Sequence, residues 1–181
     1  MLENLIIKNN FITKKTADFI NCFFRSKCIL NPSGFLNYTF DLNDTKYLDD
    51  LESCIVKDLI KMIISSICFE IGLQKNKIIL KHFLYQVLLE GQELGYHNDA
   101  SSFSLDYSGY SALLYLNDNY EGGEILFYNK KYDDDSYIKI KPNSGDCIFF
   151  PGDSDHPHSV NKVKKGERSS LIIFFDIVGK Q

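Results

Sequence analysis

The residues of this chain whose types and spacing could bind a metal are two histidines and an aspartate. His97 and Asp99 lie two positions apart, and side chains two apart on an extended strand share one face, so both can reach the same atom. His158, arriving from a distant strand, completes a set of two histidines and one carboxylate that leaves positions open on a metal. The pattern predicts a metal site with room for a ligand from outside the protein.

Arg168 adds a carboxylate-binding group to this set. It follows His158 at an even separation, which keeps the two side chains on one face if the strand is continuous. An ordinary surface ion pair is the alternative, but the apolar run 171–175 that follows favours an inward guanidinium. An inward guanidinium needs an anion, and its planar fork binds a carboxylate with two hydrogen bonds. The four residues together predict a metal site that holds a carboxylate-bearing cosubstrate.

Two helices followed by many short strands are expected to position these residues. A short opening strand at 5–7 precedes Thr13, which is predicted to cap a helix that turns Ala17, Ile20, Phe23 and Phe24 toward the core. A second helix is predicted from Thr45 to near Gly72, because apolar residues recur there at helical spacing. Those residues are Leu48, Leu51, Ile55, Leu59, Met62, Ile63 and Ile67.

From residue 78 onward, β-rich segments alternate with turns such as 106–109 and 121–123. Helices first and strands later indicate an α+β domain, with helices covering one face of a strand-rich core whose mouth can hold a ligand. We expect one domain over 1–181, with helical support in 1–76 and the catalytic core in 77–181.

Composition narrows the class of protein. The 181 residues carry a net charge of −4, which gives no electrostatic case for binding duplex nucleic acid. No apolar run approaches the length of a membrane span, and residues 1–4 do not begin a signal peptide. The five cysteines show no zinc-like pairing and lie mostly in apolar surroundings typical of buried thiols. We therefore expect a cytoplasmic protein without nucleic-acid or membrane partners.

Five ordered motifs between Tyr85 and Asp176 resemble a known family. They are Glu90-Gly91-Gln92 through Tyr96-His97-Asn98-Asp99, Tyr115-Leu116-Asn117-Asp118 with Glu121-Gly122-Gly123-Glu124, Pro142-Asn143-Ser144-Gly145-Asp146 with Phe149-Phe150-Pro151, His158-Ser159-Val160, and Gly166-Glu167-Arg168-Ser169-Ser170. In this order they resemble the Fe(II)/2-oxoglutarate-dependent oxygenases and, within them, the prolyl 4-hydroxylase-like group.

The resemblance implies a double-stranded β-helix, or jelly-roll, core with the N-terminal helices on one face. It implies Fe(II) bound by His97, Asp99 and His158, with Arg168 anchoring the far carboxylate of 2-oxoglutarate. Tyr115 and Ser170 are the further cosubstrate-binding residues that it implies. The implied reaction uses O2, converts 2-oxoglutarate to succinate and carbon dioxide, and hydroxylates a substrate C–H bond, with ascorbate as an optional reductant. Because this chemistry requires no protein acid or base, we assign no such catalytic residue.

Several of these residues have plainer interpretations. Asp99 could end a strand at a turn, Tyr115 could be a core tyrosine, and Ser170 could be an ordinary strand serine. By analogy with the family's His-x-Val motif, His158 is favoured over His156 as the ligand. His156 then lies behind the ligands or faces substrate, and His82, the remaining histidine, is expected to be an ordinary surface or core residue.

The family pattern is broken at two places that bear on substrate. Leu88-Leu89 stands where relatives commonly carry a tyrosine, and Ser108-Gly109-Tyr110 stands where some carry an arginine. We expect 100–110 to form a wall of the mouth, with aromatic recognition through Phe103, Tyr107 and Tyr110. This favours a peptidyl prolyl substrate over a free amino acid or another small metabolite. Asp133-Asp134-Asp135 is expected to be a solvated hairpin loop.

Two other classes of function remain open on the sequence. A zinc hydrolase also uses three protein ligands and a water, but it needs a general base and gives Arg168 no role. A non-catalytic jelly-roll binding module with a vestigial site is the second alternative. The intact ligand set and arginine argue against such decay.

Overall fold

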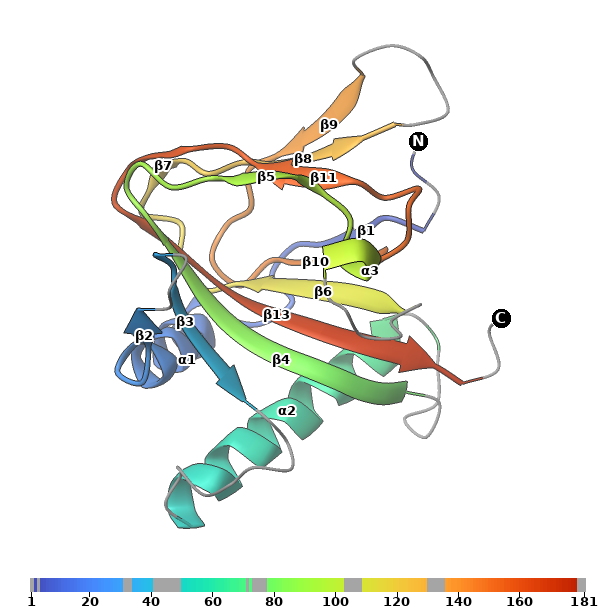
Figure 1. The fold of residues 1–181 in the computed structure, drawn as a ribbon. Coiled ribbons are helices and arrows are strands. Elements are labelled where there is room, and N and C mark those ends of the chain that lie inside the picture. The colour runs from blue at the N-terminus through green and yellow to red at the C-terminus, as the bar shows by residue number, and fades with distance from the viewer. Residues whose placement is uncertain are drawn as a thin grey trace.

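The computed structural model describes residues 2, 4–30, 34–40, 50–70, 72, 78–102, 109–129 and 136–178 (Figure 1). Helices α1 (Lys14–Arg25) and α2 (Asp50–Glu70) and the short α3 (Asp99–Ser102) accompany thirteen strands in the described part. The strands are β1 (Ile6–Lys8), β2 (Ile29–Leu30), β3 (Leu36–Phe40), β4 (Ile78–Leu89), β5 (Leu94–His97), β6 (Tyr110–Tyr115), β7 (Glu121–Gly122), β8 (Ile125–Tyr128), β9 (Tyr137–Ile140), β10 (Cys147–Pro151), β11 (His158–Val160), β12 (Val163–Lys165) and β13 (Glu167–Ile177).

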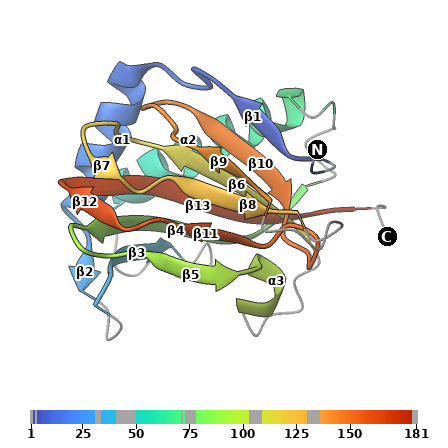
Figure 2. The ribbon, with the colours of Figure 1, turned by 90° about the horizontal axis from the view of Figure 1, so that it is seen from above.

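Two antiparallel sheets face each other in the described part of the chain. The larger has seven strands in the order β1-β10-β6-β13-β4-β3-β2, and the smaller has four in the order β5-β11-β8-β9. A two-stranded pair, β12-β7, closes one end (Figure 2). This arrangement confirms the expected α+β class and double-stranded β-helix core. Because β1, β2 and β3 join the larger sheet, residues before 77 supply strands as well as helices, and the domain boundaries stay a prediction.

The long strands β4 and β13 divide their side chains between two cores because successive residues point to opposite faces. Phe83, Tyr85 and Val87 of β4 pack in an outer core with α1 and α2. Leu88 packs in an inner core between the two sheets. Both helices lie against the outer face of the larger sheet, away from the smaller sheet (Figure 1). The expected packing of helices on one face is therefore observed.

The N-terminal helix matches its prediction closely. Thr13 caps α1, and its hydroxyl accepts a hydrogen bond from the backbone N–H of Thr16 at 3.2 Å. Ala17, Ile20 and Phe24 are fully buried. The opening strand also forms, as β1, at the edge of the larger sheet.

The second helix is confirmed over 50–70, while its predicted start at Thr45 lies outside the described residues. Ile63 and Ile67 face the core as expected. Met62, which belongs to the predicted apolar pattern, is exposed, and Ile60, which that pattern left out, is buried. Ile60, Ile63 and Ile67 follow a spacing of three and four, which is the stripe that a helix presents to one surface.

The cysteines are less uniformly buried than expected. Cys68 and Cys147 are buried, but Cys22 and Cys54 are exposed and Cys28 is intermediate. All five are free thiols. Burial raises the pKa of the Cys147 thiol well above its ordinary value. The cytoplasmic location stays a prediction, and no helix in the described ranges has the length and hydrophobicity of a membrane span.

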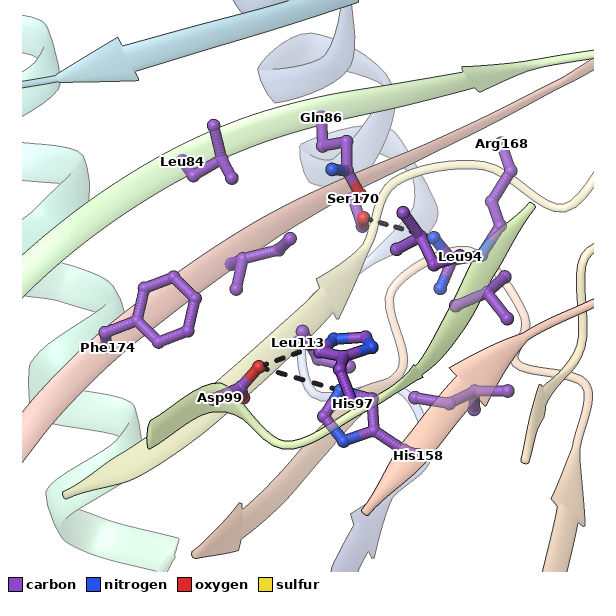
Figure 3. Close-up of a pocket in the computed structure, with 13 residues that line it drawn as sticks. Leu84, Gln86, Leu94, His97, Asp99, Leu113, His158, Arg168, Ser170 and Phe174 are labelled. Atoms are coloured by element: carbon purple, nitrogen blue, oxygen red, sulfur yellow. Dashed lines mark hydrogen bonds and ion pairs between the residues drawn. The ribbon is translucent and has the colours of Figure 1, made fainter. Parts of the chain in front are cut away.

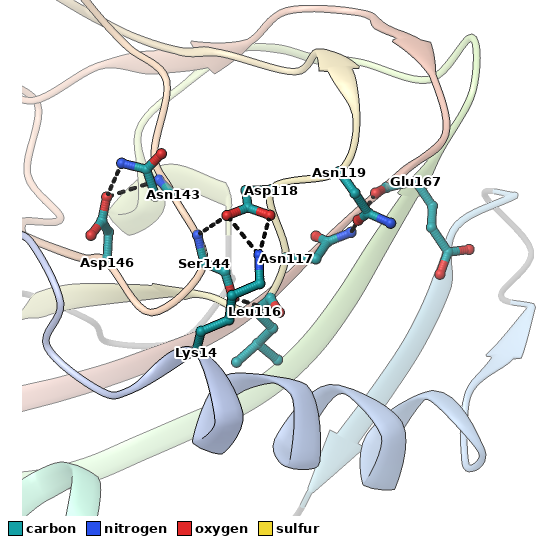
Figure 4. A network of polar contacts seen from close by, with 9 residues as sticks. All are labelled: Lys14, Leu116, Asn117, Asp118, Asn119, Asn143, Ser144, Asp146 and Glu167. Atoms are coloured by element: carbon teal, nitrogen blue, oxygen red, sulfur yellow. Dashed lines mark hydrogen bonds and ion pairs between the residues drawn. The ribbon is translucent and has the colours of Figure 1, made fainter.

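A polar network fixes the turn 142–146 against helix α1 (Figure 4). The Lys14 ammonium donates to Asp118 at 2.8 Å, and the Ser144 N–H donates to the same carboxylate at 3.4 Å. The Asn143 N–H donates to Asp146 at 2.8 Å and closes the turn. Gly145 has a φ of +91°, and a Cβ there would meet the Ile12 carbonyl oxygen at 2.3 Å. The Pro-x-x-Gly-Asp motif is therefore a structural turn that seats β10 beside β6.

Candidate metal centre and cosubstrate pocket

The structure brings His97, Asp99 and His158 together. Their ligand atoms all lie within 4.8 Å of one another. The Oδ1 atom of Asp99 is 3.7 Å from Nε2 of His97 and 3.6 Å from Nε2 of His158. Figure 3 shows the three side chains converging at one end of a pocket. Two imidazole nitrogens and one carboxylate oxygen form the donor set that suits a non-haem iron with open positions.

The sequence analysis placed His97 and Asp99 on one strand, but the structure places them on two different elements. His97 ends β5 and is the direct antiparallel partner of His158, which begins β11. Asp99 begins α3, so the alternation of strand side chains does not explain its position. The chain turns after His97 and still returns the carboxylate to the histidine pair. The residue assignment from the sequence agrees with this geometry, although the reason for it was wrong.

Backbone carbonyls orient both imidazoles. The carbonyl oxygen of Gly95 is 2.7 Å from Nδ1 of His97, and the carbonyl oxygen of His156 is 3.1 Å from Nδ1 of His158. Because a carbonyl can only accept, each Nδ1 carries the proton and donates it, and each Nε2 keeps its lone pair for a metal. Such contacts behind the ligands fix the ring tautomer and orientation in metalloproteins.

Asp99 and His158 are also prepared electrostatically. The Ser111 hydroxyl donates a hydrogen bond to Oδ2 of Asp99, which leaves Oδ1 directed at the histidines. Burial lowers the pKa of His158, against the opposing effect of the Asp99 charge. Metal binding requires a neutral imidazole, and the lowered pKa of His158 favours that state.

Arg168 lies in the same pocket, on the larger sheet. It is 2% exposed, and Nη2 donates to the Tyr115 hydroxyl at 3.1 Å while Nη1 donates to Ser170 Oγ at 3.4 Å. Its Nε atom has no hydrogen-bond partner, and no carboxylate of the described residues pairs with it. A buried guanidinium that contacts hydroxyls and no carboxylate of the described residues lacks the anion that would compensate its charge.

The expected continuous strand from His158 to Arg168 is not observed. His158 is in β11 of the smaller sheet, whereas Arg168 is in β13 of the larger sheet, with β12 between them. The two residues face each other across the space between the sheets. Asn117 holds the backbone on both sides of Arg168: its Nδ2 donates to the Glu167 carbonyl at 2.8 Å, and its Oδ1 accepts from the Ser169 N–H at 2.8 Å.

One pocket of about 180 Å³ connects the candidate metal ligands with Arg168. That volume is several times the ~30 Å³ that a water molecule occupies in the liquid, so a small organic ligand can enter. Polar groups gather at the ligand end and near Arg168, and apolar side chains form the walls (Figure 3). The lining residues are Leu84, Gln86, Leu94, His97, Asp99, Leu113, Ile125, His158, Val160, Arg168, Ser170, Ile172 and Phe174.

Tyr115 and Ser170 have different positions relative to this pocket. Ser170 lines it, whereas Tyr115 is fully buried beside Arg168, whose guanidinium carbon lies 4.8 Å from the tyrosine ring centre. Burial raises the pKa of Tyr115 to about 12, so its hydroxyl remains protonated. Both residues contact Arg168 and hold its guanidinium in place.

The other histidines lie outside the cluster. The His156 ring is hydrogen-bonded to Asp153 at 2.7 Å, and the His156 backbone carbonyl contacts the His158 ring from behind. His82 packs near Phe174, with ring centres 6.1 Å apart, in agreement with an ordinary structural role.

Of the wall predicted over 100–110, the structure describes only residues 100–102 and 109–110. Phe103, Tyr107 and Ser108 lie outside the described residues, as does the 133–135 loop. Tyr110 does not face the mouth as predicted, because it stacks on Phe175 in the outer core with ring centres 5.9 Å apart.

Two polar residues at the site escaped the sequence analysis. Ser111 lies four positions before Tyr115, an even spacing that places both on one face of β6. Gln86 interrupts the apolar run 83–89, where a lone amide is a detectable signal of a buried polar contact.

Comparison with known sequences gives two kinds of match. Residues 83–176, more than half of the chain, match the family model described as the 2OG-Fe(II) oxygenase superfamily. Prolyl 3-hydroxylase 2 from Homo sapiens is 40% identical over 68 residues, which are 38% of this chain and 10% of that protein. Prolyl 3-hydroxylase 1 from Gallus gallus is 36% identical over 69 residues. The aligned segment thus spans about a tenth of these curated relatives.

Solved structures support the fold. A prolyl-4-hydroxylase from Pseudomonas putida aligns over 97% of this chain and 93% of its own, with a TM-score of 0.66 and 18% identity. The viral collagen prolyl hydroxylase from Paramecium Bursaria Chlorella virus-1 aligns over 97% of both chains, with a TM-score of 0.61 and 19% identity. At such identities the likeness concerns the fold. Together with the sequence match over 83–176, it shows that the chain belongs to the 2OG-Fe(II) oxygenase superfamily, whose members use Fe(II), 2-oxoglutarate and O2.

Proposed function

We propose that this oxygenase is a hydroxylase that acts on a peptidyl prolyl residue. In this proposal His97, Asp99 and His158 bind Fe(II), and Arg168 anchors the far carboxylate of 2-oxoglutarate with Tyr115 and Ser170. The observation that carries it is the buried Arg168 without a carboxylate partner among the described residues, in the same pocket as the three ligands. A dicarboxylate that spans the pocket would supply an anion at one end and metal-binding oxygens at the other.

The chain's own residues bind, orient and exclude water. Bound iron, with 2-oxoglutarate and O2, supplies the oxidation of the substrate C–H bond, while the protein positions the reactants. The Gly95 and His156 carbonyls and the Ser111 hydroxyl hold the ligands in orientation. The walls of the pocket are mainly aliphatic, which keeps water away from the reacting centre.

The choice of a prolyl substrate rests on the relatives and on the wall beside the ligands. Sequence relatives are prolyl 3-hydroxylases, and a structural neighbour from Trichoplax adhaerens is a prolyl hydroxylase in complex with a peptide fragment. Phe174 is the direct cross-strand partner of Ser111, which bonds Asp99, so an apolar ring lies near the metal end of the pocket. An uncharged pyrrolidine ring suits such a wall better than a charged side chain does.

Succinate release tests this proposal. The purified protein, loaded with Fe(II) and 2-oxoglutarate in air, is given the blocked peptide Ala-Ala-Ala-Pro-Ala-Ala-Ala, the same peptide with alanine in place of proline, or a panel of free amino acids. We expect the proline peptide to raise succinate release several-fold above the peptide-free rate, and the alanine peptide to leave it unchanged. Tight coupling to a free amino acid, with no peptide effect, would overturn the peptidyl substrate and keep the oxygenase.

A further inference from the structure

A row of polar side chains crosses the inner face of the larger sheet. Asn37 of β3 pairs directly with Gln86 of β4, Gln86 with Ser170 of β13, and Ser170 with Tyr115 of β6. Direct antiparallel partners point to the same face of a sheet. The row therefore runs from the hydroxyls that hold Arg168 outward to β3, which is next to the edge strand β2.

Gln86 has unused hydrogen-bonding capacity in this row. It is 7% exposed and lines the pocket beside Ser170 (Figure 3). Its amide oxygen is buried and accepts no hydrogen bond from the described residues, and the same holds for the side-chain oxygen of Asn37. A buried acceptor without a donor is costly, and such groups are rare in folded proteins unless a ligand or a water satisfies them.

The chemistry of these two oxygens discriminates between possible ligands. At neutral pH 2-oxoglutarate has two carboxylates and a keto group, which only accept hydrogen bonds, and Arg168 and Ser170 already offer donors to it. Two unsatisfied acceptors instead match a ligand that brings N–H groups. A prolyl residue has no main-chain N–H, so these donors would come from its neighbours in a peptide.

We propose that Gln86 is a specificity-determining residue that accepts a main-chain N–H of the peptide next to the target residue. Asn37 extends this contact toward the edge of the sheet. The inference rests on the proposed peptidyl substrate and names how that substrate is recognised. Ile79, on the same strand as Gln86 but exposed and outside the pocket lining, provides an apolar control position.

Anaerobic binding of a fluorescein-labelled Ala-Ala-Ala-Pro-Ala-Ala-Ala peptide to the protein loaded with Fe(II) and 2-oxoglutarate tests the inference. Gln86→Met keeps the length of the side chain and removes its acceptor, and Ile79→Met is the matched control. Two further peptides carry a single N-methyl group, one on the residue before proline and one on the residue after it. The 2-oxoglutarate concentration that half-saturates each variant is measured in parallel from the visible charge-transfer band.

We expect Gln86→Met to weaken peptide binding about tenfold, as the loss of one buried hydrogen bond predicts, and Ile79→Met to change it less than twofold. One N-methylated peptide should bind wild-type protein about tenfold more weakly and should lose little further affinity on Gln86→Met. Should Gln86→Met fail to fold, Asn37→Leu is measured in its place, with a several-fold loss expected.

Three outcomes would overturn the inference. Unchanged peptide binding in Gln86→Met contradicts it while leaving the peptidyl substrate intact. A tenfold shift of the 2-oxoglutarate midpoint with unchanged peptide binding would assign Gln86 to the cosubstrate instead. Absence of peptide binding to wild-type protein would overturn the inference and the proposed substrate together.

Discussion

The two faces of the seven-stranded sheet use the same strands for different purposes. On the outer face Tyr85, Val87 and Leu171 pack with α1 and α2 in a continuous apolar core. On the inner face their immediate neighbours Gln86 and Ser170 line the pocket. Neighbouring residues on β4 or β13 therefore serve different purposes: one contributes to the stability of the outer core, and the next contributes to ligand binding in the pocket.

Stability and ligand binding are therefore separable in this fold. The buried polar residues of the inner face, among them Arg168, offer little hydrophobic stabilisation and include unsatisfied atoms. The outer core and its two helices provide the rigid support that tolerates them. Substitutions on the two faces should therefore give different readouts.

The largest effect is expected at His97, Asp99 and His158, which lie across the pocket from the inner face of the larger sheet. His97→Ala, Asp99→Ala and His158→Ala should each abolish iron-dependent turnover, because a three-ligand site has no spare ligand. His156→Ala is the control: it removes a ring bonded to Asp153 but keeps the carbonyl behind His158, so iron binding should persist. Succinate release in air measures the turnover of each variant, and equilibrium dialysis with Fe(II) under argon measures its iron binding. Loss of iron in His156→Ala with retention in His158→Ala would reverse the assignment.

Phe24→Ala in the outer core should affect stability alone. Phe24 is fully buried and lies against Tyr85 and Phe83, with ring centres 5.7 and 5.6 Å away. Its truncation should lower the free energy of unfolding by about 3–5 kcal/mol. Urea denaturation measures this loss. The 2-oxoglutarate midpoint at low temperature should stay within twofold of the wild type, and a larger shift would show that the two faces are coupled.

Arg168→Ala should lower the affinity for 2-oxoglutarate, which Phe24→Ala should leave unchanged. Removing a buried partner of a charge pair costs about 2–5 kcal/mol, so 2-oxoglutarate affinity should fall by about 30- to 5,000-fold. Iron affinity without cosubstrate should not change, since Arg168 is not among the clustered ligands. Arg168→Lys should recover only part of the affinity because a point charge replaces a planar fork. Unchanged 2-oxoglutarate dependence in Arg168→Ala would refute the anchor.

A smaller effect is expected at Ser111. Ser111→Ala removes the donor to Oδ2 of Asp99, which orients the carboxylate toward the histidines. Loss of a contact behind a metal ligand typically lowers metal affinity about 10- to 100-fold. Competition with a fluorescent Fe(II) chelator measures this change. Wild-type affinity in Ser111→Ala would mean that the turn after His97 alone fixes Asp99.

The sequence predicted the site residues better than the reasons for their convergence. Residue types and family-like order identified His97, Asp99, His158 and Arg168, and the structure places all four in one pocket. The supporting geometry was wrong at Asp99, which begins α3, and between His158 and Arg168, which lie on different sheets. Alternation holds within a strand, and it carries no information on where a chain turns or changes sheet.

The helices could be predicted because capping and periodicity, like strand alternation, act within one element. Thr13 and the apolar stripe of α1 are short-range signals, and both were confirmed. In α2 the apolar spacing does not fix which side faces the core, because apolar residues lie on several sides, and Met62 is exposed. Gln86 and Asn37 could not be paired from the sequence, because their meeting depends on the register of two strands far apart in the chain.

The most direct test of the account is an anaerobic titration of the protein with Fe(II), with and without 2-oxoglutarate, followed in the visible spectrum. We predict a metal-to-ligand charge-transfer band that requires both additions, saturates at one equivalent of iron, disappears in His158→Ala, and needs far more 2-oxoglutarate in Arg168→Ala. A zinc hydrolase or a binding module with a vestigial site would give no such band. Its absence from wild-type protein that binds iron would contradict the assignment of this pocket to 2-oxoglutarate.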